Sequence, residues 1–182
     1  MKNRFLSVPI VALLLLFAAG SRILNAELHL WNFAPIAALG LFSGAVLKDK
    51  RYAFLLPIGA QLLADLYFQL FTSTPGFYGI SQLFVYGGMA LVTLFGMTMG
   101  KPNAAKVGGY ALASSGIFFL VSNFGTYLTG IWGTGFAGLS KTFVMAVPFY
   151  QNTLIGDLVF SALFFGIYAL VQQARPARVS AA

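Results

Sequence analysis

Six apolar runs, separated by short polar segments, make up most of the chain. They cover residues 5–24, 33–47, 52–71, 79–100, 107–129 and 152–171. An α-helix needs about 20 mostly apolar residues to cross the ~30 Å hydrocarbon core of a bilayer. The pattern therefore predicts an all-α membrane protein. We expect a single bundle of six transmembrane helices, forming one integral membrane domain over residues 1–182.

The longest connection between two runs covers residues 130–151, which are rich in glycine and aromatic residues and carry one charge, Lys141. It is too long for a simple turn, and we expect a short interfacial or re-entrant helix around Lys141–Val147. By contrast, residues 72–76 have the composition of a turn, with threonine, serine, proline and glycine.

The composition supports the membrane interpretation. Hydrophobic residues make up 59% of the chain and charged residues 8%, against about 25% charged in soluble domains. The N-terminus also fits a secretory signal peptide, with Lys2 and Arg4 before an apolar run and small residues at 18–21. Because the apolar character continues to Leu24, we interpret this run as the first spanning helix and leave cleavage open.

Basic residues predict the orientation of the bundle. Cytoplasmic loops of membrane proteins carry an excess of Lys and Arg. With both termini cytoplasmic, nine basic residues lie inside and two, Arg22 and Lys141, lie outside. The nine are Lys2, Arg4, Lys48, Lys50, Arg51, Lys101, Lys106, Arg175 and Arg178. The net charge of +7 is thus a topology signal, and we expect no nucleic-acid partner.

Two of the four acidic residues, Asp65 and Asp157, lie inside apolar runs. A carboxylate at such depth costs roughly 2.5–3.5 kcal/mol on insertion scales, so it marks a functional site by default. Counted at 1.5 Å per residue from Tyr52, Asp65 lies about 20 Å up the third run. Asp157 lies about 8 Å below Asn152 by the same rise. Both carboxylates are therefore predicted in the outer third of the bundle.

Other polar residues fall at the same predicted depth, which predicts a polar cavity open to the outside above a tightly packed inner half. The candidate substrate-binding residues are Arg22, Asn32, Asp65, Asn123, Tyr127, Asn152 and Asp157. Residues 130–150 are the expected lid. Two alternatives stay open: Asp157 could cap the start of the sixth helix or pair with Arg22, and Asn152 could be an N-cap.

Small residues recur four apart in several runs, a spacing that lets membrane helices approach closely. The pairs are Ala34/Ala38, Gly40/Gly44, Ala60/Ala64, Gly96/Gly100 and Ala162/Gly166. We interpret them as packing positions within the bundle, with docking onto a partner protein as the alternative.

Catalytic and cofactor motifs are missing from the sequence. It has no cysteine, no His-Glu-x-x-His, no Gly-x-Ser-x-Gly and no nucleotide-binding glycine loop. His29 is the single histidine. We therefore expect no enzyme activity, no cofactor and no metal. Uphill transport would need an ion gradient or a partner ATPase.

Five segments resemble a family of small bacterial membrane proteins described as transport proteins. The segments are Arg22-Ile-Leu, NFAPIAALGLFSG from Asn32, Ala64-Asp65-Leu, Ser122-Asn123-Phe-Gly, and PFYQNTLIGD from Pro148. That family is similar to the substrate-binding S components of energy-coupling factor (ECF) transporters. The resemblance implies six helices in the bacterial plasma membrane and a pocket near the outer face that captures a small nutrient or vitamin-like substrate.

One departure from the S components concerns partners. S components that share an ATPase module often carry Ala-x-x-x-Ala on the first helix, whereas this chain has Val8-Pro-Ile-Val-Ala12 there. Docking onto an energy-coupling subunit with ATPases therefore stays open. The alternative function is a membrane scaffold or assembly subunit that packs against another membrane protein and binds no small molecule.

Overall fold

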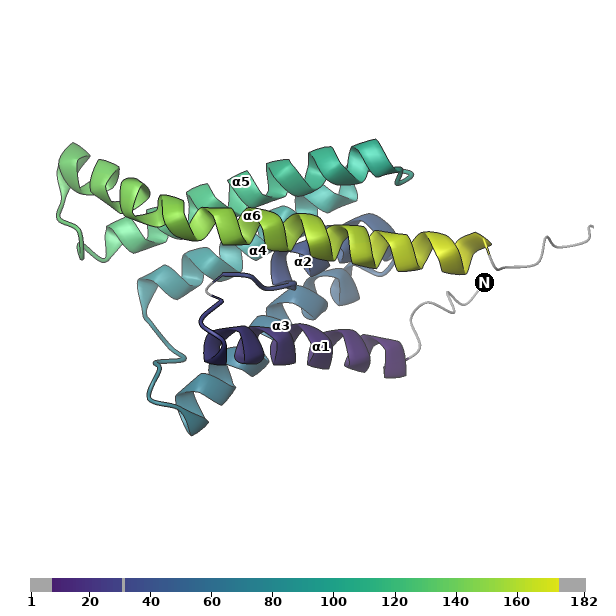
Figure 1. Ribbon diagram of the computed structural model, residues 1–182, viewed down its shortest axis with the longest axis horizontal. Helices are drawn as coiled ribbons and strands as arrows, with labels where there is room; N and C mark the ends of the chain where they lie inside the picture. Colours follow the sequence, from purple (N-terminus) through teal and green to yellow (C-terminus); the bar gives the residue numbers. More distant parts are fainter. Residues whose placement is uncertain (1–7, 31, 174–182) are drawn as a thin grey trace, which may run out of the picture.

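The computed structural model describes residues 8–30 and 32–173, and its secondary structure is helical in these residues (Figure 1). The helices are α1 Val8–Glu27, α2 Ile36–Val46, α3 Lys50–Phe71, α4 Ile80–Met97, α5 Ala104–Leu128 and α6 Gly135–Gln173. Five of them, all but α2, are long and apolar enough to cross a membrane. The all-α prediction is thus confirmed for the described residues. The expected start of the first helix at Phe5 and the charges of Lys2, Arg4, Arg175 and Arg178 lie outside them.

The short helix α2 is the centre of the bundle. It contacts each of the other five helices, and its residues 36–44 are all buried. With 11 residues it rises only about 16 Å, so the predicted spanning helix over 33–47 is wrong in length. Pro35, which precedes the helix, is its N-cap residue. A helix that is apolar on all sides is stable when surrounded by protein, which is where α2 lies.

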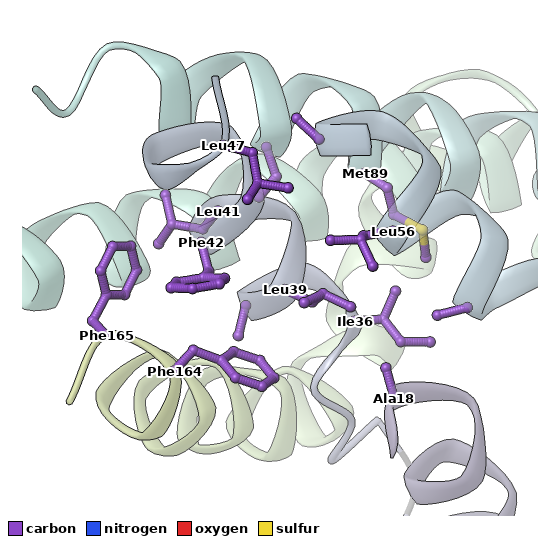
Figure 2. Packing of buried hydrophobic residues seen from close by; sticks show 14 of the residues in the cluster. Ala18, Ile36, Leu39, Leu41, Phe42, Leu47, Leu56, Met89, Phe164 and Phe165 are labelled. Atoms are coloured by element: carbon purple, nitrogen blue, oxygen red, sulfur yellow. The ribbon is translucent and has the colours of Figure 1, made fainter. Parts of the chain in front are cut away.

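The core is formed by α2 and the helices around it (Figure 2). Phe42 of α2 packs against Phe164 and Phe165 of α6, with ring centroids 5.7 and 5.3 Å apart. A side chain at Gly44 or Gly96 would collide with backbone atoms of the facing helix. The backbones of α2 and α4 therefore nearly touch, and these small residues serve packing inside the bundle.

Helix α6 is the largest difference from the expected elements. It begins at Gly135 and continues to Gln173, a length of 39 residues, so the expected start at residue 152 and the separate short helix at Lys141–Val147 are both wrong. Pro148 lies within the helix, a position that membrane helices tolerate when neighbouring groups satisfy the freed backbone carbonyl. Its first half packs on α5, where Phe119 contacts Phe143 at 5.7 Å and Tyr150 at 4.5 Å between ring centroids.

The two ends of the bundle differ in charge. Helix α1 begins and helix α6 ends at the same end (Figure 1). The connections after α2 and α4 lie at this end too, and they bring Lys48 and Lys101 there. The connections over residues 28–35, 72–79 and 129–134 lie at the opposite end. The cavity described next lies toward that opposite end.

Candidate ligand cavity

A cavity of about 400 Å³ is lined by side chains from all six helices and from the connections after α1 and α3. Its polar lining residues are Arg22, Asn25, Asn32, Gln61, Thr74, Tyr78, Ser81, Ser122, Asn123, Thr126, Thr153 and Asp157. Rings of Phe33, Phe68, Tyr78 and Phe118 add apolar wall. Polar groups converging on a partly aromatic pocket of this size are typical of small-molecule sites.

Asp65 lies behind the wall of this cavity as the centre of a hydrogen-bond network. It is fully buried. Its Oδ1 accepts from Arg22 Nη1 at 2.5 Å and from Gln61 Nε2 at 3.0 Å. Its Oδ2 accepts from Gln82 Nε2 at 3.0 Å and from the Tyr86 hydroxyl at 2.8 Å. The donors come from α1, α3 and α4, so this carboxylate joins three helices and keeps little acceptor capacity for a ligand.

Arg22 connects that network to the cavity. It pairs with Asp65, and this is the salt bridge found within residues 8–30 and 32–173. Its guanidinium also lies 5.2 Å from the ring centroid of Phe68, a distance typical of a cation–π contact. The proposed pairing of Arg22 with Asp157 is therefore wrong: Arg22 lines the cavity with its position fixed by Asp65.

Hydrogen bonds to side chains of α3 and α4 hold the connection over residues 72–79 next to the network around Asp65. Gln69 Oε1 accepts from the backbone N–H groups of Gly76 and Phe77, at 3.2 and 3.3 Å. Gln82 donates to the carbonyl of Gly76 at 3.2 Å. Burial, with a further contribution from the charge of Asp65, raises the pKa of Tyr78 to about 12. Tyr78 therefore faces the cavity as a neutral phenol at physiological pH.

Asp157 has different surroundings from Asp65. It lies about six turns after the start of α6, so it does not cap its own helix. Its carboxyl group lies against the backbone N–H of Ala38, in the first turn of α2. Pro35, the N-cap residue of α2, provides no side-chain cap. Asp157 therefore lies near the first turn of α2, where the helix dipole favours a negative charge.

The structure brings four of the seven candidate residues to the cavity wall: Arg22, Asn32, Asn123 and Asp157. Asn32 has a positive φ of 64°, a conformation that Asn tolerates better than most residues. Asn123 donates to the carbonyl of Phe119 at 2.8 Å. Asp65, Tyr127 and Asn152 are not among the lining residues. Asn152 lies inside α6 and so is not an N-cap.

Sequence reasoning missed the contribution of α4 and of residues 72–79. Gln82 and Tyr86 are four residues apart, as are Gln61 and Asp65, so both pairs lie on single helix faces. This spacing of four between polar residues was the feature of the sequence that could have indicated a polar face on α4. The expected lid at residues 130–150 contributes no lining residue, whereas Thr74, Pro75 and Tyr78 do.

These observations define an all-helical protein with five helices suited to cross a membrane and a polar cavity within the bundle. Within the described residues, no group of three or more His, Cys, Asp or Glu could hold a metal ion. The chain belongs to DUF6580, a family of unknown function, whose family model matches residues 2–178. No curated protein and no solved structure matches the chain.

Proposed function

We propose that this protein is a bacterial plasma-membrane transport protein, similar to ECF S components, that captures a small nutrient or vitamin-like molecule. The observation that supports this most is the cavity of about 400 Å³. Its volume falls within the range of small-molecule sites, and a purely structural bundle has no need for twelve polar residues around one cavity.

The orientation of the bundle follows from its charges under the positive-inside rule. Lys48, Lys50, Arg51, Lys101 and Lys106 lie around the connections after α2 and α4, and we place this end, with both termini, in the cytoplasm. The cavity is then in the outer half of the protein. A protein that captures an external nutrient requires this arrangement.

Individual residues receive separate roles in this proposal. Arg22, Asn32 and Asn123 donate hydrogen bonds to the substrate from α1, the segment before α2, and α5. Phe33, Phe118 and the neutral phenol of Tyr78 pack against its apolar part. Asp65 is a positioning residue, because its carboxylate accepts from Arg22 at 2.5 Å and from Gln61 at 3.0 Å. The substrate thus meets Arg22 and Gln61 but not Asp65.

Residues 72–79 are the part of the wall best suited to open for the substrate. Thr74, Pro75 and Tyr78 line the cavity. The side-chain oxygens of Gln69 and Gln82 accept from the backbone N–H groups of Gly76, Phe77 and Tyr78. These bonds, with N···O distances of 3.2–3.4 Å, are weaker than the short ones to Asp65. Opening of this segment would leave the Asp65 network in place.

Native mass spectrometry of the purified full-length protein tests the proposal by detecting a retained small molecule. Titration of that compound should then show that Asn123→Ala weakens binding roughly tenfold, as expected for one lost hydrogen bond. Gln151→Ala is the matched control, because Gln151 is an exposed amide on α6 outside the cavity.

The alternative, a membrane scaffold, predicts the opposite result. The purified protein would carry no small molecule, and one membrane protein would co-purify in a fixed ratio. Co-purification of a coupling subunit with ATPases alongside a retained ligand would instead extend the S-component proposal to its energy source.

A further inference from the structure

Four buried side-chain oxygens in the described part of the chain have no hydrogen-bond partner, and all four lie on α5 or α6. They are Oγ of Ser114, Oγ of Ser115, Oδ2 of Asp157 and Oγ of Ser161. Asp157 and Ser161 are four residues apart, so they lie on one face of α6. The Ser115 hydroxyl lies beside the Asp157 carboxyl without the geometry of a formed hydrogen bond. Ser115 thus lies beside Asp157 across the contact between α5 and α6, and Ser161 is one turn further along the same face of α6.

Several other hydroxyl side chains of α5 and α6 donate a hydrogen bond to a backbone carbonyl of their own helix, and Ser115 and Ser161 do not. Ser122, Thr142 and Thr153 donate to the carbonyl oxygen four residues earlier, at 2.7, 2.8 and 3.2 Å. This bond is the usual solution for a hydroxyl inside a membrane helix. Ser115 and Ser161 are at most 1% exposed and lack it. Their oxygens therefore remain available in the buried space between helices.

No cationic side chain of residues 8–30 and 32–173 forms an ion pair with Asp157. Arg22 is paired with Asp65 at 2.5 Å, and the neighbour of the Asp157 carboxyl group on α2 is the backbone N–H of Ala38. A carboxylate at membrane depth is costly until it is neutralised. One carboxylate oxygen with two hydroxyl oxygens is a hard donor set carrying a single negative charge. A single carboxylate balances the charge of a monovalent cation but not that of Ca²⁺ or Mg²⁺, which protein sites usually hold with more than one carboxylate or with substrate phosphates.

We propose that Asp157, Ser115 and Ser161 form a sodium-binding site next to the ligand cavity. Asp157 belongs to the cavity wall, so Na⁺ reaches the site from the same side as the substrate. The role of the ion rests on the proposed function: Na⁺ binding couples substrate capture to a sodium gradient, as at the ion sites of other membrane transporters. Such coupling supplies an energy source that needs no ATPase partner.

Thermal unfolding of the full-length protein in detergent tests the sodium site without any knowledge of the substrate. NaCl is titrated against choline chloride at constant ionic strength. We expect a saturable rise in Tm on the order of 5 °C for the unaltered protein. Asp157→Asn should abolish the rise, and the double variant Ser115→Ala/Ser161→Ala should raise the half-saturating Na⁺ concentration roughly tenfold or more.

Ser43→Ala is the matched control, because Ser43 is fully buried but donates to the carbonyls of Gly40 and Ala53. It should lower Tm and leave the sodium-dependent rise unchanged. Direct ²²Na⁺ binding to the same proteins gives a second readout if Asp157→Asn folds poorly, since the serine variants keep the carboxylate.

Three results would overturn the sodium site. One is a Tm that does not respond to Na⁺ at constant ionic strength. Another is a sodium response that survives in both the Asp157 and the double serine variants. The third is a response to pH alone that Asp157→Asn removes, which would assign a proton to this carboxyl. None of these bears on whether the cavity retains a small molecule, so failure of the sodium site and failure of the proposed function are distinguishable.

Discussion

Asp65 and Asp157 are both buried carboxylates inside the bundle, yet their surroundings differ in kind. Asp65 accepts hydrogen bonds from Arg22, Gln61, Gln82 and Tyr86. Asp157 lies against one backbone amide, that of Ala38, and its Oδ2 has no partner in the described residues. The comparison shows that burial alone does not identify a ligand group: Asp65 has its acceptor capacity filled by three helices, whereas Asp157 keeps an oxygen without a partner.

Asp65→Asn should have the largest effect on stability. The amide presents a donor to Gln82 or Tyr86 and leaves Arg22 without a counter-charge, and breaking a buried ion pair costs about 3–5 kcal/mol. Thermal unfolding in detergent measures the loss. Asp49→Asn is the control, because Asp49 is an exposed N-cap of α3 and Asn caps equally well. Similar Tm values for Asp65→Asn and the control would contradict the structural role of Asp65.

A double-mutant cycle of Arg22→Met and Asp65→Asn measures how much of this stability comes from the direct interaction of the two side chains. Because the two side chains interact directly at 2.5 Å, the double variant should be less destabilised than the sum of the single ones, by about 1–3 kcal/mol. The free energies of unfolding of all four proteins give the coupling. Strict additivity would show that the two groups act independently.

Asp157→Asn should cost far less than Asp65→Asn when measured in sodium-free buffer. The Asn side chain keeps an oxygen near the N–H of Ala38, so the loss should be about 1 kcal/mol or less. Asp157→Leu removes that oxygen and should cost about 1 kcal/mol more. The comparison would fail if Asp157→Asn destabilised the bundle as much as Asp65→Asn does.

Tyr78→Phe should have the smallest effect, visible only at high pH. The pKa of Tyr78 is raised to about 12 from an ordinary value of 10.0, so between these values the folded state binds more protons than the unfolded state. Stability must then fall as pH rises through this interval. Tm of the unaltered protein should decrease more steeply from pH 10 to pH 12 than Tm of Tyr78→Phe. Parallel curves would place Tyr78 in a solvent-like environment.

The sequence allowed the helical class and much of the cavity to be predicted. Apolar runs predicted the helices, and the cost of a buried charge identified Asp65 and Asp157 as notable positions. Four of the seven candidate residues line one cavity. The partners of Asp65 on α4 were not predicted, because contacts between helices depend on how each rotates about its axis, which spacing within one helix does not fix.

Asp157 shows why the remaining details required the structure. Its neighbour is the amide of Ala38, whose N–H has no carbonyl partner within α2 because the helix begins at Ile36. An apolar run over 33–47 looks the same in sequence whether it spans a bilayer or forms a short buried helix. The glycines of residues 130–138 likewise suggested a break, whereas packing on α5 keeps α6 helical from Gly135 onward.

The shortness of α2 has a consequence for how the protein is made. A helix that rises about 16 Å is too short to span a bilayer by itself, so α2 is stable in the membrane only when it packs against the neighbouring helices. The last of these is α6, whose Asp157 and Phe164 reach α2 from the end of the chain. The central helix α2 is therefore fully packed only after α6 has been inserted. In a nascent chain that stops before α6, the face of α2 that packs on α6 would stay uncovered.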